Sequence, residues 1–339
     1  MNQRIRLLNV LRKLGTDRQP FICPGGMMNM AVMEIMEASQ CTWPQAHLDP
    51  KMMAQLTLAA SRLAGIENAG VPFCMTVEAE AMGAAIDLGS LESEPNVATY
   101  PMERVTDLDQ LKTLDPKSGR AKICVEAIRI LHTEAPDIPV FANLTGPVSL
   151  ATSLLEPLTF YRALVRNKSA AHDLMKLVVQ NLTIFGSALI EAGADLICIA
   201  DPSASGELLG KNAFSEFALP YINELLRHFR KEYGIPSIVH ICGKVQSLGT
   251  ALSELDAECI SVDAVVRLSK LKDLAPSKIV MGNVNTYLMQ NGQPNGVYKN
   301  GCRCLNTGAD ILAPACGMST RTPIKNIRSL SQAVLNKEL

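Results

Sequence analysis

The chain has 339 residues, of which 47% are apolar and 19% are charged, and its formal net charge is −1. This balance, with 4% aromatic residues and no basic run, does not indicate a nucleic acid or another polyanion as a partner. The length is sufficient for two average domains or for one large α/β barrel.

Targeting signals are not evident. The first residues are basic but lead into no continuous apolar core, so we expect no signal peptide, and a transit peptide is the weaker alternative. No apolar run approaches the roughly 20 residues that a membrane-spanning helix needs, so we expect no membrane partner. We predict a cytoplasmic protein, in which the ten cysteines are thiols or metal ligands rather than disulfides.

Short apolar runs alternate with longer helical patterns along the chain. Residues 1–19 predict an N-terminal helical lead-in, because Ile5, Leu8 and Leu11 have helical spacing. Buried strands are predicted at 20–23, 68–75, 140–144, 195–200, 237–242, 258–263, 278–283 and 310–314. Helices are predicted at 160–192 (one helix or two), 214–233, 245–255, 268–274, 296–306 and 323–335. Between the second and third strands, 87–101 predict an irregular inserted loop.

Eight strands that alternate with helices predict a parallel sheet. We therefore assign the chain to the α/β class, as a (βα)8 TIM-type barrel with an N-terminal helical extension, and we expect residues 1–339 to form a single domain. A doubly wound sheet is the alternative, because the first half of the chain is only weakly periodic. In a barrel the chemistry lies at the C-terminal ends of the strands, so functional residues are expected there.

Three residues near two strand ends have the chemistry of metal ligands. His240 and Cys242 are two positions apart in one strand, so their side chains point to the same side. Cys316 follows the eighth strand and supplies a third donor. One imidazole and two thiolates, with a fourth position left for a substrate, form the ligand set of a catalytic zinc. We predict a zinc site that activates a thiol.

The His-x-Cys pattern alone has an equally good structural explanation. A buried histidine with a backbone partner, next to a cysteine packed for its apolar character, gives the same sequence. Cys316, which stands in a matching context before a glycine, shifts the interpretation towards a metal.

Further polar residues follow the predicted strands. Asp201 and Asn283 are candidates for substrate binding, with a turn or helix cap as the alternative for Asp201 and a structural hydrogen bond for Asn283. Glu78 and Glu80 are predicted to lie in a solvated loop rather than to face the barrel mouth.

Two sulfur-rich patterns are assigned to packing. Cys302 and Cys304 lie two positions apart in a helical pattern and so point to different sides. The methionines between residues 27 and 36 are expected to fill the core, with a large apolar ligand-facing surface as the alternative.

The segment His240-Ile241-Cys242-Gly243, together with 312–317 and 322–327, resembles the methylcobamide:coenzyme M methyltransferases of the uroporphyrinogen decarboxylase superfamily. The resemblance covers most of the chain and is most specific in its last hundred residues. It implies a (βα)8 barrel in which His240, Cys242 and Cys316 hold zinc. Asp263 is the candidate fourth ligand, where family members carry adjacent acidic residues.

The resemblance implies a zinc-dependent methyltransferase. It would move a methyl group from a methylated corrinoid, the methyl-Co(III) co-substrate carried on a separate corrinoid protein, to a small thiol acceptor such as coenzyme M. The sulfonate of that thiol needs a donor or cation, for which Lys244 and Arg321 are candidates.

Three other functions are alternatives. Methyl transfer from an O- or N-methyl donor to a corrinoid protein is compatible with the same zinc ligands. Uroporphyrinogen decarboxylation would use the arginines of a Met-Arg-Gln-Ala-Gly-Arg segment, whereas 23–30 contain no arginine. A non-catalytic zinc-binding paralogue that docks a corrinoid protein is the third.

Overall fold

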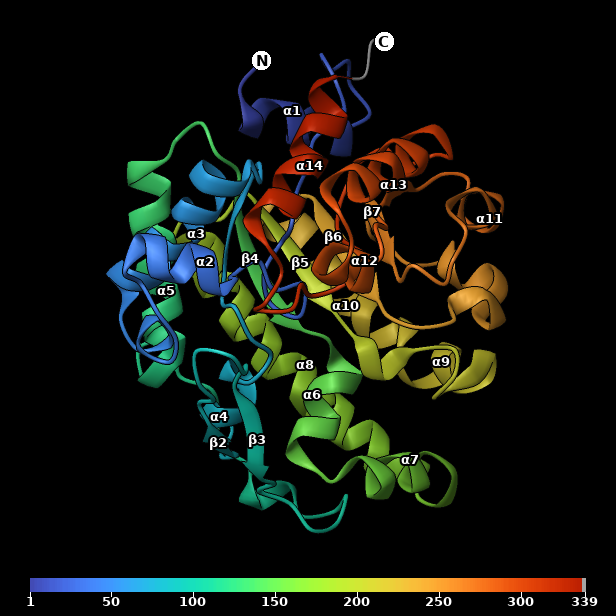
Figure 1. The fold of residues 1–339 in the computed structure, drawn as a ribbon. Helices are drawn as coiled ribbons and strands as arrows, with labels where there is room; N and C mark the ends of the chain where they lie inside the picture. Colours follow the sequence, from blue (N-terminus) through green and yellow to red (C-terminus); the bar gives the residue numbers. More distant parts are fainter. Residues whose placement is uncertain (337–339) are drawn as a thin grey trace.

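The computed structural model describes residues 1–336, in which a central parallel sheet is surrounded by helices (Figure 1). The sheet has six strands, which neighbour one another in chain order: β1 (Ala69–Val71), β4 (Val140–Thr145), β5 (Leu196–Ala200), β6 (Ser237–Ile241), β7 (Cys259–Val262) and β8 (Ile279–Met281). Every residue of these six strands is buried. Burial on both faces explains why the strands are near-continuous apolar runs rather than alternating ones.

Two further segments close the sheet into a ring. In the closing segment 311–314, Ile311 pairs in parallel with Met281 of β8 and Leu312 pairs in parallel with Phe21. On the other side of Phe21, its carbonyl accepts a hydrogen bond of 2.8 Å from the N–H of Glu67, just before β1. The ring therefore contains eight parallel segments at the eight predicted places. The (βα)8 TIM-type barrel is confirmed, and the doubly wound sheet, which would leave two free edges, does not occur.

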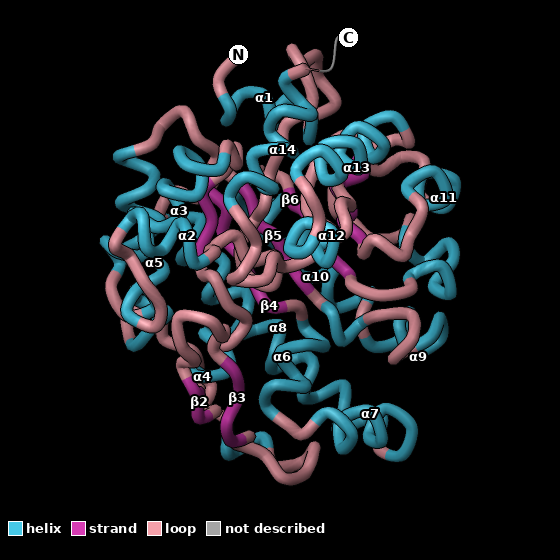
Figure 2. The backbone as a smooth tube through the Cα atoms, viewed as in Figure 1, coloured by secondary structure: helices cyan, strands magenta, loops and turns pink. Residues whose placement is uncertain are grey.

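Helices cover the outside of the ring, and Figure 2 shows the strands enclosed by them. They are α1 (Gln3–Leu11), α2 (Met33–Ser39), α3 (Pro50–Ala64), α4 (Val77–Ala81), α5 (Gly119–Glu134), α6 (Pro147–Leu154), α7 (Pro157–Arg166), α8 (Lys168–Glu191), α9 (Gly210–Phe217), α10 (Leu219–Tyr233), α11 (Leu268–Leu274), α12 (Thr286–Asn291), α13 (Pro294–Asn306) and α14 (Ile324–Leu335), with short 3-10 turns η1 (Gln45–His47), η2 (Leu108–Gln110), η3 (Pro202–Ala204) and η4 (Val245–Leu252). Helices α3 and α5 pack on β1, and α8 packs on β4 and β5.

Several predicted helices are divided or shortened in the structure. The region 160–192 is two helices, because the Asn167 side chain ends α7 and accepts a hydrogen bond from the Ala170 N–H of α8. The predicted helix 214–233 is likewise divided at Ala218 into α9 and α10. The predicted helix 245–255 is a 3-10 turn interrupted by Gly249. Helix α1 accounts for only part of the lead-in at 1–19.

The prediction of an irregular loop at 87–101 is wrong. Strands β2 (Ala85–Asp87) and β3 (Asn96–Thr99) form an antiparallel hairpin that stands apart from the ring in Figure 2. The two strands are short and no residue in them is fully buried, so the sequence carries no apolar alternation to reveal them. The tip of the hairpin contacts the segment after Cys316, because Thr320 donates a hydrogen bond to the Glu92 carbonyl at 3.0 Å.

Helix α8 corrects the expectation that no stretch suits a membrane helix. Among the described residues it is the one helix that is long and apolar enough to cross a membrane, with a mean hydropathy of 1.3 over its best window. The sequence reading missed it because polar residues such as Asn181 interrupt the apolar run. In the structure 56% of that window is buried, and α8 packs on β4, β5 and α10 as a core helix does.

Candidate metal centre

Three donor atoms converge at the C-terminal rim of the barrel. His240 is fully buried in β6, Cys242 follows directly after this strand, and Cys316 follows the closing segment 311–314. The Nε2 atom of His240 lies 3.1 Å from the Sγ atom of Cys242, which lies 3.2 Å from the Sγ atom of Cys316. One ligand atom from each residue lies within 4.8 Å of the others. The structure thus brings together the three residues predicted as ligands.

A serine on the neighbouring strand fixes the histidine ring. The Nδ1 atom of His240 lies 2.9 Å from the Oγ atom of Ser261, and both residues are fully buried. This contact leaves Nε2 facing the two sulfurs. Sequence reasoning did not single out Ser261. The signal was the strand register, since His240 and Ser261 are direct partners where β6 pairs with β7.

The Sγ atoms of Cys242 and Cys316 are in hydrogen-bond contact. A hydrogen bond from the Cys242 thiol, together with the nearby His240, lowers the pKa of Cys316 below its ordinary value. The same hydrogen bond, with burial and the negative charge of the Cys316 thiolate, raises the pKa of Cys242. The pair therefore holds one negative charge readily and a second only when a cation compensates for it.

The donor set fits a zinc ion. Two thiolates and one imidazole are typical ligands of zinc, and the second imidazole nitrogen of such a ligand usually has a hydrogen-bond partner. In tetrahedral geometry with zinc–sulfur bonds of about 2.3 Å, two sulfurs lie about 3.8 Å apart. Cys242 and Cys316 would therefore separate by about half an ångström from their present 3.2 Å, which the half-buried Cys242 side chain can accommodate by a small rotation.

Asp263, the candidate fourth ligand, lies just after β7 and outside the group of three converging residues. Its Oδ1 atom accepts a hydrogen bond of 3.0 Å from the N–H of Val265. Its charge is one of the causes that raise the pKa of Cys242, which places it in the vicinity of the sulfurs. Its role as a ligand stays a prediction.

Glu94, at the tip of the hairpin, is an acidic residue of the site that the sequence reading missed. Its side chain is exposed to solvent, although protein atoms crowd around its carboxyl group. This enclosure, and the negative charge at Cys316, raise the pKa of Glu94 to about 7. No sequence signal could have found it, because its position depends on how the hairpin folds over the rim.

Asp201 has a structural role that needs no substrate. Its carboxylate is fully buried and accepts hydrogen bonds from the N–H groups of Val148 and Ser149 and from the Ser149 hydroxyl, at 2.7–3.1 Å. It therefore caps the first turn of α6 from a neighbouring loop. Burial raises the pKa of Asp201 to about 6 despite these hydrogen bonds. Contact between Asp201 and a substrate stays a prediction.

Asn283 likewise holds a neighbouring loop. Its Nδ2 group donates to the carbonyls of Asp263 and Val266, both at 2.8 Å. This is the structural alternative that the sequence left open, and substrate contact stays a prediction here too.

The expectation of a solvated loop around Glu78 is wrong. Glu78 belongs to α4 and is fully buried, where it accepts hydrogen bonds from the N–H and hydroxyl groups of Thr145. Burial raises the pKa of its carboxyl group. A five-residue helix gives too little periodicity to be recognised in the sequence.

The two candidate cations for a sulfonate already have acidic neighbours. Lys244 lies 3.4 Å from Glu207, and Arg321 forms an ion pair with Glu92 of the hairpin. Both side chains are exposed, so these pairs are weak and exchangeable.

The methionines serve packing and also reach the site. Met28, Met30 and Met36 are fully buried, as expected for core packing. The Met27 Sδ atom lies 3.9 Å from the Cys242 Sγ atom, and the Met28 Sδ atom lies 3.7 Å from the Ser261 Oγ atom. The metal centre therefore has soft, apolar surroundings on this side.

Comparisons with known proteins place the whole chain in one family. The family described as uroporphyrinogen decarboxylase (URO-D) matches residues 2–336. The chain is 32% identical over 333 residues to the methylcobamide:CoM methyltransferase MtbA of Methanosarcina acetivorans, covering 98% of this chain and 97% of that protein. It is 29% identical to the methylcobamide:CoM methyltransferase MtaA of Methanosarcina barkeri, covering 97% and 96%. The solved structure of a methyltransferase from Methanosarcina mazei superposes with a TM-score of 0.88 at 28% identity, covering 98% of both chains.

Proposed function

Because the chain belongs to the uroporphyrinogen decarboxylase family, in its methylcobamide:coenzyme M methyltransferase branch, we propose that it transfers a methyl group from a methylated corrinoid to the thiol of coenzyme M or a similar small thiol. The chain is an enzyme of the methyltransferase class. The observation that carries the proposal is the convergence of His240, Cys242 and Cys316 within 4.8 Å at the barrel rim.

We further propose that these three residues hold zinc. When bound, zinc would lower the pKa of a thiol in its fourth position and so supply a nucleophile at neutral pH. Two thiolates and a neutral imidazole cancel the charge of the ion, so the incoming sulfur would keep its electron density. The sulfur attacks the methyl group of the methyl-Co(III) corrinoid, and the products are a methyl thioether and a Co(I) corrinoid.

The protein residues orient the ligands and receive the proton. Ser261 holds Nδ1 of His240, which keeps Nε2 directed at the metal position. Asp263 is our candidate for a fourth ligand that leaves when the thiol enters. We propose Glu94, whose pKa is raised to about 7 by its surroundings and by the charge at Cys316, as the group that accepts the proton that the thiol loses.

The proposed partners follow from this reaction. A corrinoid bound to a separate protein would approach the rim where Cys316 lies, and a small thiol would enter beside it. All ten cysteines are free thiols in the structure, which supports the cytoplasmic location that we propose.

Metal analysis of the purified protein tests the zinc site. We expect about one zinc per chain in the natural protein and well under one in Cys316→Ala and His240→Ala. Cys302→Ala is the matched control, because this thiol lies on α13 away from the site. Full zinc content in Cys316→Ala would contradict the site.

Methyl transfer from free methylcobalamin to coenzyme M tests the reaction, followed by the absorbance change as Co(III) becomes Co(I). We expect turnover in the natural protein and Cys302→Ala, and a loss on the order of hundredfold or more in Cys316→Ala. If the protein holds zinc but methylates no thiol, two alternatives are favoured: methyl transfer from an O- or N-methyl donor to a corrinoid protein, or a non-catalytic paralogue that docks a corrinoid protein. A screen of O- and N-methyl donors with a corrinoid protein separates those two.

A further inference from the structure

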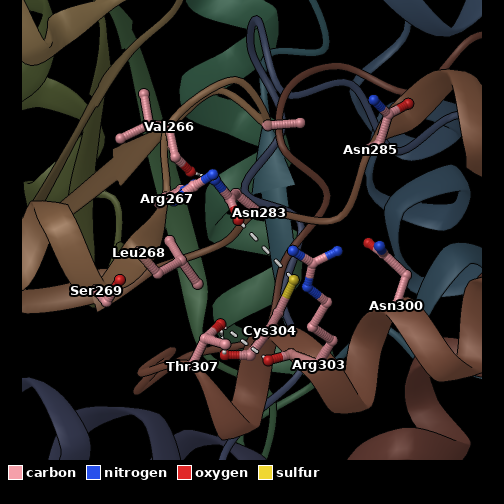
Figure 3. Close-up of a pocket in the computed structure, with 11 residues that line it drawn as sticks. Val266, Arg267, Leu268, Ser269, Asn283, Asn285, Asn300, Arg303, Cys304 and Thr307 are labelled. Atoms are coloured by element: carbon pink, nitrogen blue, oxygen red, sulfur yellow. Dashed lines mark hydrogen bonds between the residues drawn. The ribbon is translucent and has the colours of Figure 1, made fainter.

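A second polar recess lies between the loop that follows β7, the loop that follows β8, and helix α13 (Figure 3). Its volume is about 280 Å³. None of the three candidate zinc ligands lines it. The recess is therefore not the metal centre itself, although it shares Asn283 and the loop after Asp263 with the surroundings of that site.

Two arginines give this recess an uncompensated positive charge. Arg267 comes from the loop before α11, and Arg303 comes from α13. Among residues 1–336, neither guanidinium has an ion-pair partner, and none of the residues lining the recess is acidic. Unpaired arginine charges at the edge of a cavity attract anions from solution.

The Asn285 carboxamide adds a hydrogen-bond donor to the recess, whereas the NH2 group of Asn283 already donates to the carbonyls of Asp263 and Val266. In Figure 3 the Arg303 guanidinium rises from α13 between Asn283 and Asn300. The Oδ1 atom of Asn285 accepts a hydrogen bond of 2.9 Å from the Leu288 N–H, which leaves its NH2 group as the free donor. Guanidinium and amide N–H groups together are the donors that bind the oxygens of phosphate groups.

The size of the recess indicates more than a bare anion. A cavity needs only about 10–15 Å³ to hold one water molecule, and this recess has about 280 Å³. A phosphate group fills only part of this space. We propose that the recess binds the phosphate group of a small phosphomonoester, with Arg267 and Arg303 supplying the positive charge and the Asn285 amide donating to a phosphate oxygen.

Isothermal titration calorimetry of the full chain tests this proposal, with inorganic phosphate and adenosine monophosphate as probes. We expect both to bind the natural protein, and Arg303→Gln and Arg267→Gln each to weaken binding about tenfold, with none measurable in the double variant. Arg129→Gln is the matched control, because Arg129 is exposed on α5 and likewise has no ion-pair partner among the described residues. Its affinity should not change.

A second variant separates a built recess from diffuse surface charge. Asn300→Leu keeps both arginines but removes a carboxamide, and we expect it to weaken binding severalfold. Tighter binding of adenosine monophosphate than of phosphate would show that the organic part contacts the recess, and equal binding would assign the contact to the phosphate alone.

The proposal is overturned if the natural protein binds neither probe, or if the double variant or Asn300→Leu binds as the natural protein does. Thermal unfolding gives a check that does not depend on calorimetry, because a ligand of the folded state raises the midpoint. Phosphate should raise the midpoint of the natural protein and not that of the double variant. Zinc content and methyl transfer are not expected to change in any of these variants, so failure here and failure of the proposed function are distinguishable.

Discussion

Single side chains decide the chemistry of the rim, and the pair of His240 and Ser261 shows how. The imidazole can present Nε2 to a metal only in one ring orientation, and the Ser261 hydroxyl fixes this orientation through Nδ1. Such a partner typically changes metal affinity by about ten- to hundredfold although it never touches the ion.

We therefore expect Ser261→Ala to keep the fold and lose about tenfold or more in zinc affinity, measured by competition with a chromophoric chelator. Ser187→Ala is the control, because it removes the contact of Ser187 with His228 at 3.4 Å, far from the rim. Equal zinc affinity in the natural protein and Ser261→Ala would show that the serine does not position the ligand.

His47 is a buried histidine with a different consequence. Neither ring nitrogen has a hydrogen-bond partner among the described residues, and the ring packs against Trp43 and Phe73. Burial, with a smaller contribution from the charge of Arg120, lowers the pKa of His47 to about 3. Between pH 6.5 and 3 the unfolded chain binds a proton at this position that the folded chain does not, so folding stability falls as the pH falls.

We expect His47→Phe to reduce the loss of stability between pH 6 and 4, by about 1.4 kcal/mol per pH unit relative to the natural protein. The free energy of unfolding from urea titrations at several pH values measures this. His228→Gln, a partly exposed histidine on α10, is the control and should keep the natural slope. Parallel stability curves for the natural protein and His47→Phe would contradict the assignment.

At the scale of elements, buried carboxylates hold the loops of the rim in place. Asp201 ties the start of α6 to the loop after β5, and Glu78 ties α4 to the end of β4. Asp201 and Glu78 thus stabilise the loops around the site. From the sequence alone, Asp201 was a candidate for substrate binding and Glu78 was predicted to lie in a solvated loop.

We expect Asp201→Ala to lower the free energy of unfolding by about 3 kcal/mol, because three buried donors of Val148 and Ser149 lose their acceptor. Asp201→Asn keeps one acceptor and should cost about half as much. Urea denaturation followed by circular dichroism measures both, and zinc content should not change in Asp201→Asn. Equal stability of the alanine variant and the natural protein would remove the capping role.

Elements with a strong local signal were predicted well from the sequence. The eight strand segments of the ring lie where buried apolar runs indicated them, and the three converging donors were found from their places after such strands. The sequence left open whether 160–192 form one helix or two, because the break depends on the single capping side chain of Asn167. It did not reveal the β2–β3 hairpin, because the strands of this hairpin are exposed. Ser261 and Glu94 could not be identified because register and hairpin packing are properties of the folded chain.

At the scale of the whole molecule, the barrel depends on backbone segments that approach one another closely. Gly70 in β1 lies against the segment that follows the first strand. A Cβ atom at Gly70 would lie 1.8 Å from the carbonyl oxygen of Pro24 and 3.1 Å from the Cβ atom of Phe141. Only glycine fits between these two segments, since backbone cannot rotate out of the way as a flexible side chain can.

Gly70→Ala is expected to lower the free energy of unfolding by about 3 kcal/mol or more, or to prevent folding. Gly15→Ala is the matched control, because no atom lies within 4 Å of its added Cβ, and its stability should stay within about 0.5 kcal/mol of the natural protein. Urea denaturation of both variants measures the difference. A stable Gly70→Ala barrel would show that the two segments can move apart without cost.

The closing segment 311–314 bonds to β8 on one side and to Phe21 on the other, and Cys316 follows it directly. During refolding, Cys316 reaches His240 and Cys242 only when this segment enters the ring, which joins parts of the chain that are remote in sequence and therefore slow to meet. Refolding in the presence of cobalt(II) would therefore report ring closure. We expect the cobalt–thiolate absorption to appear at the last tertiary step, and not during the early collapse of the central strands.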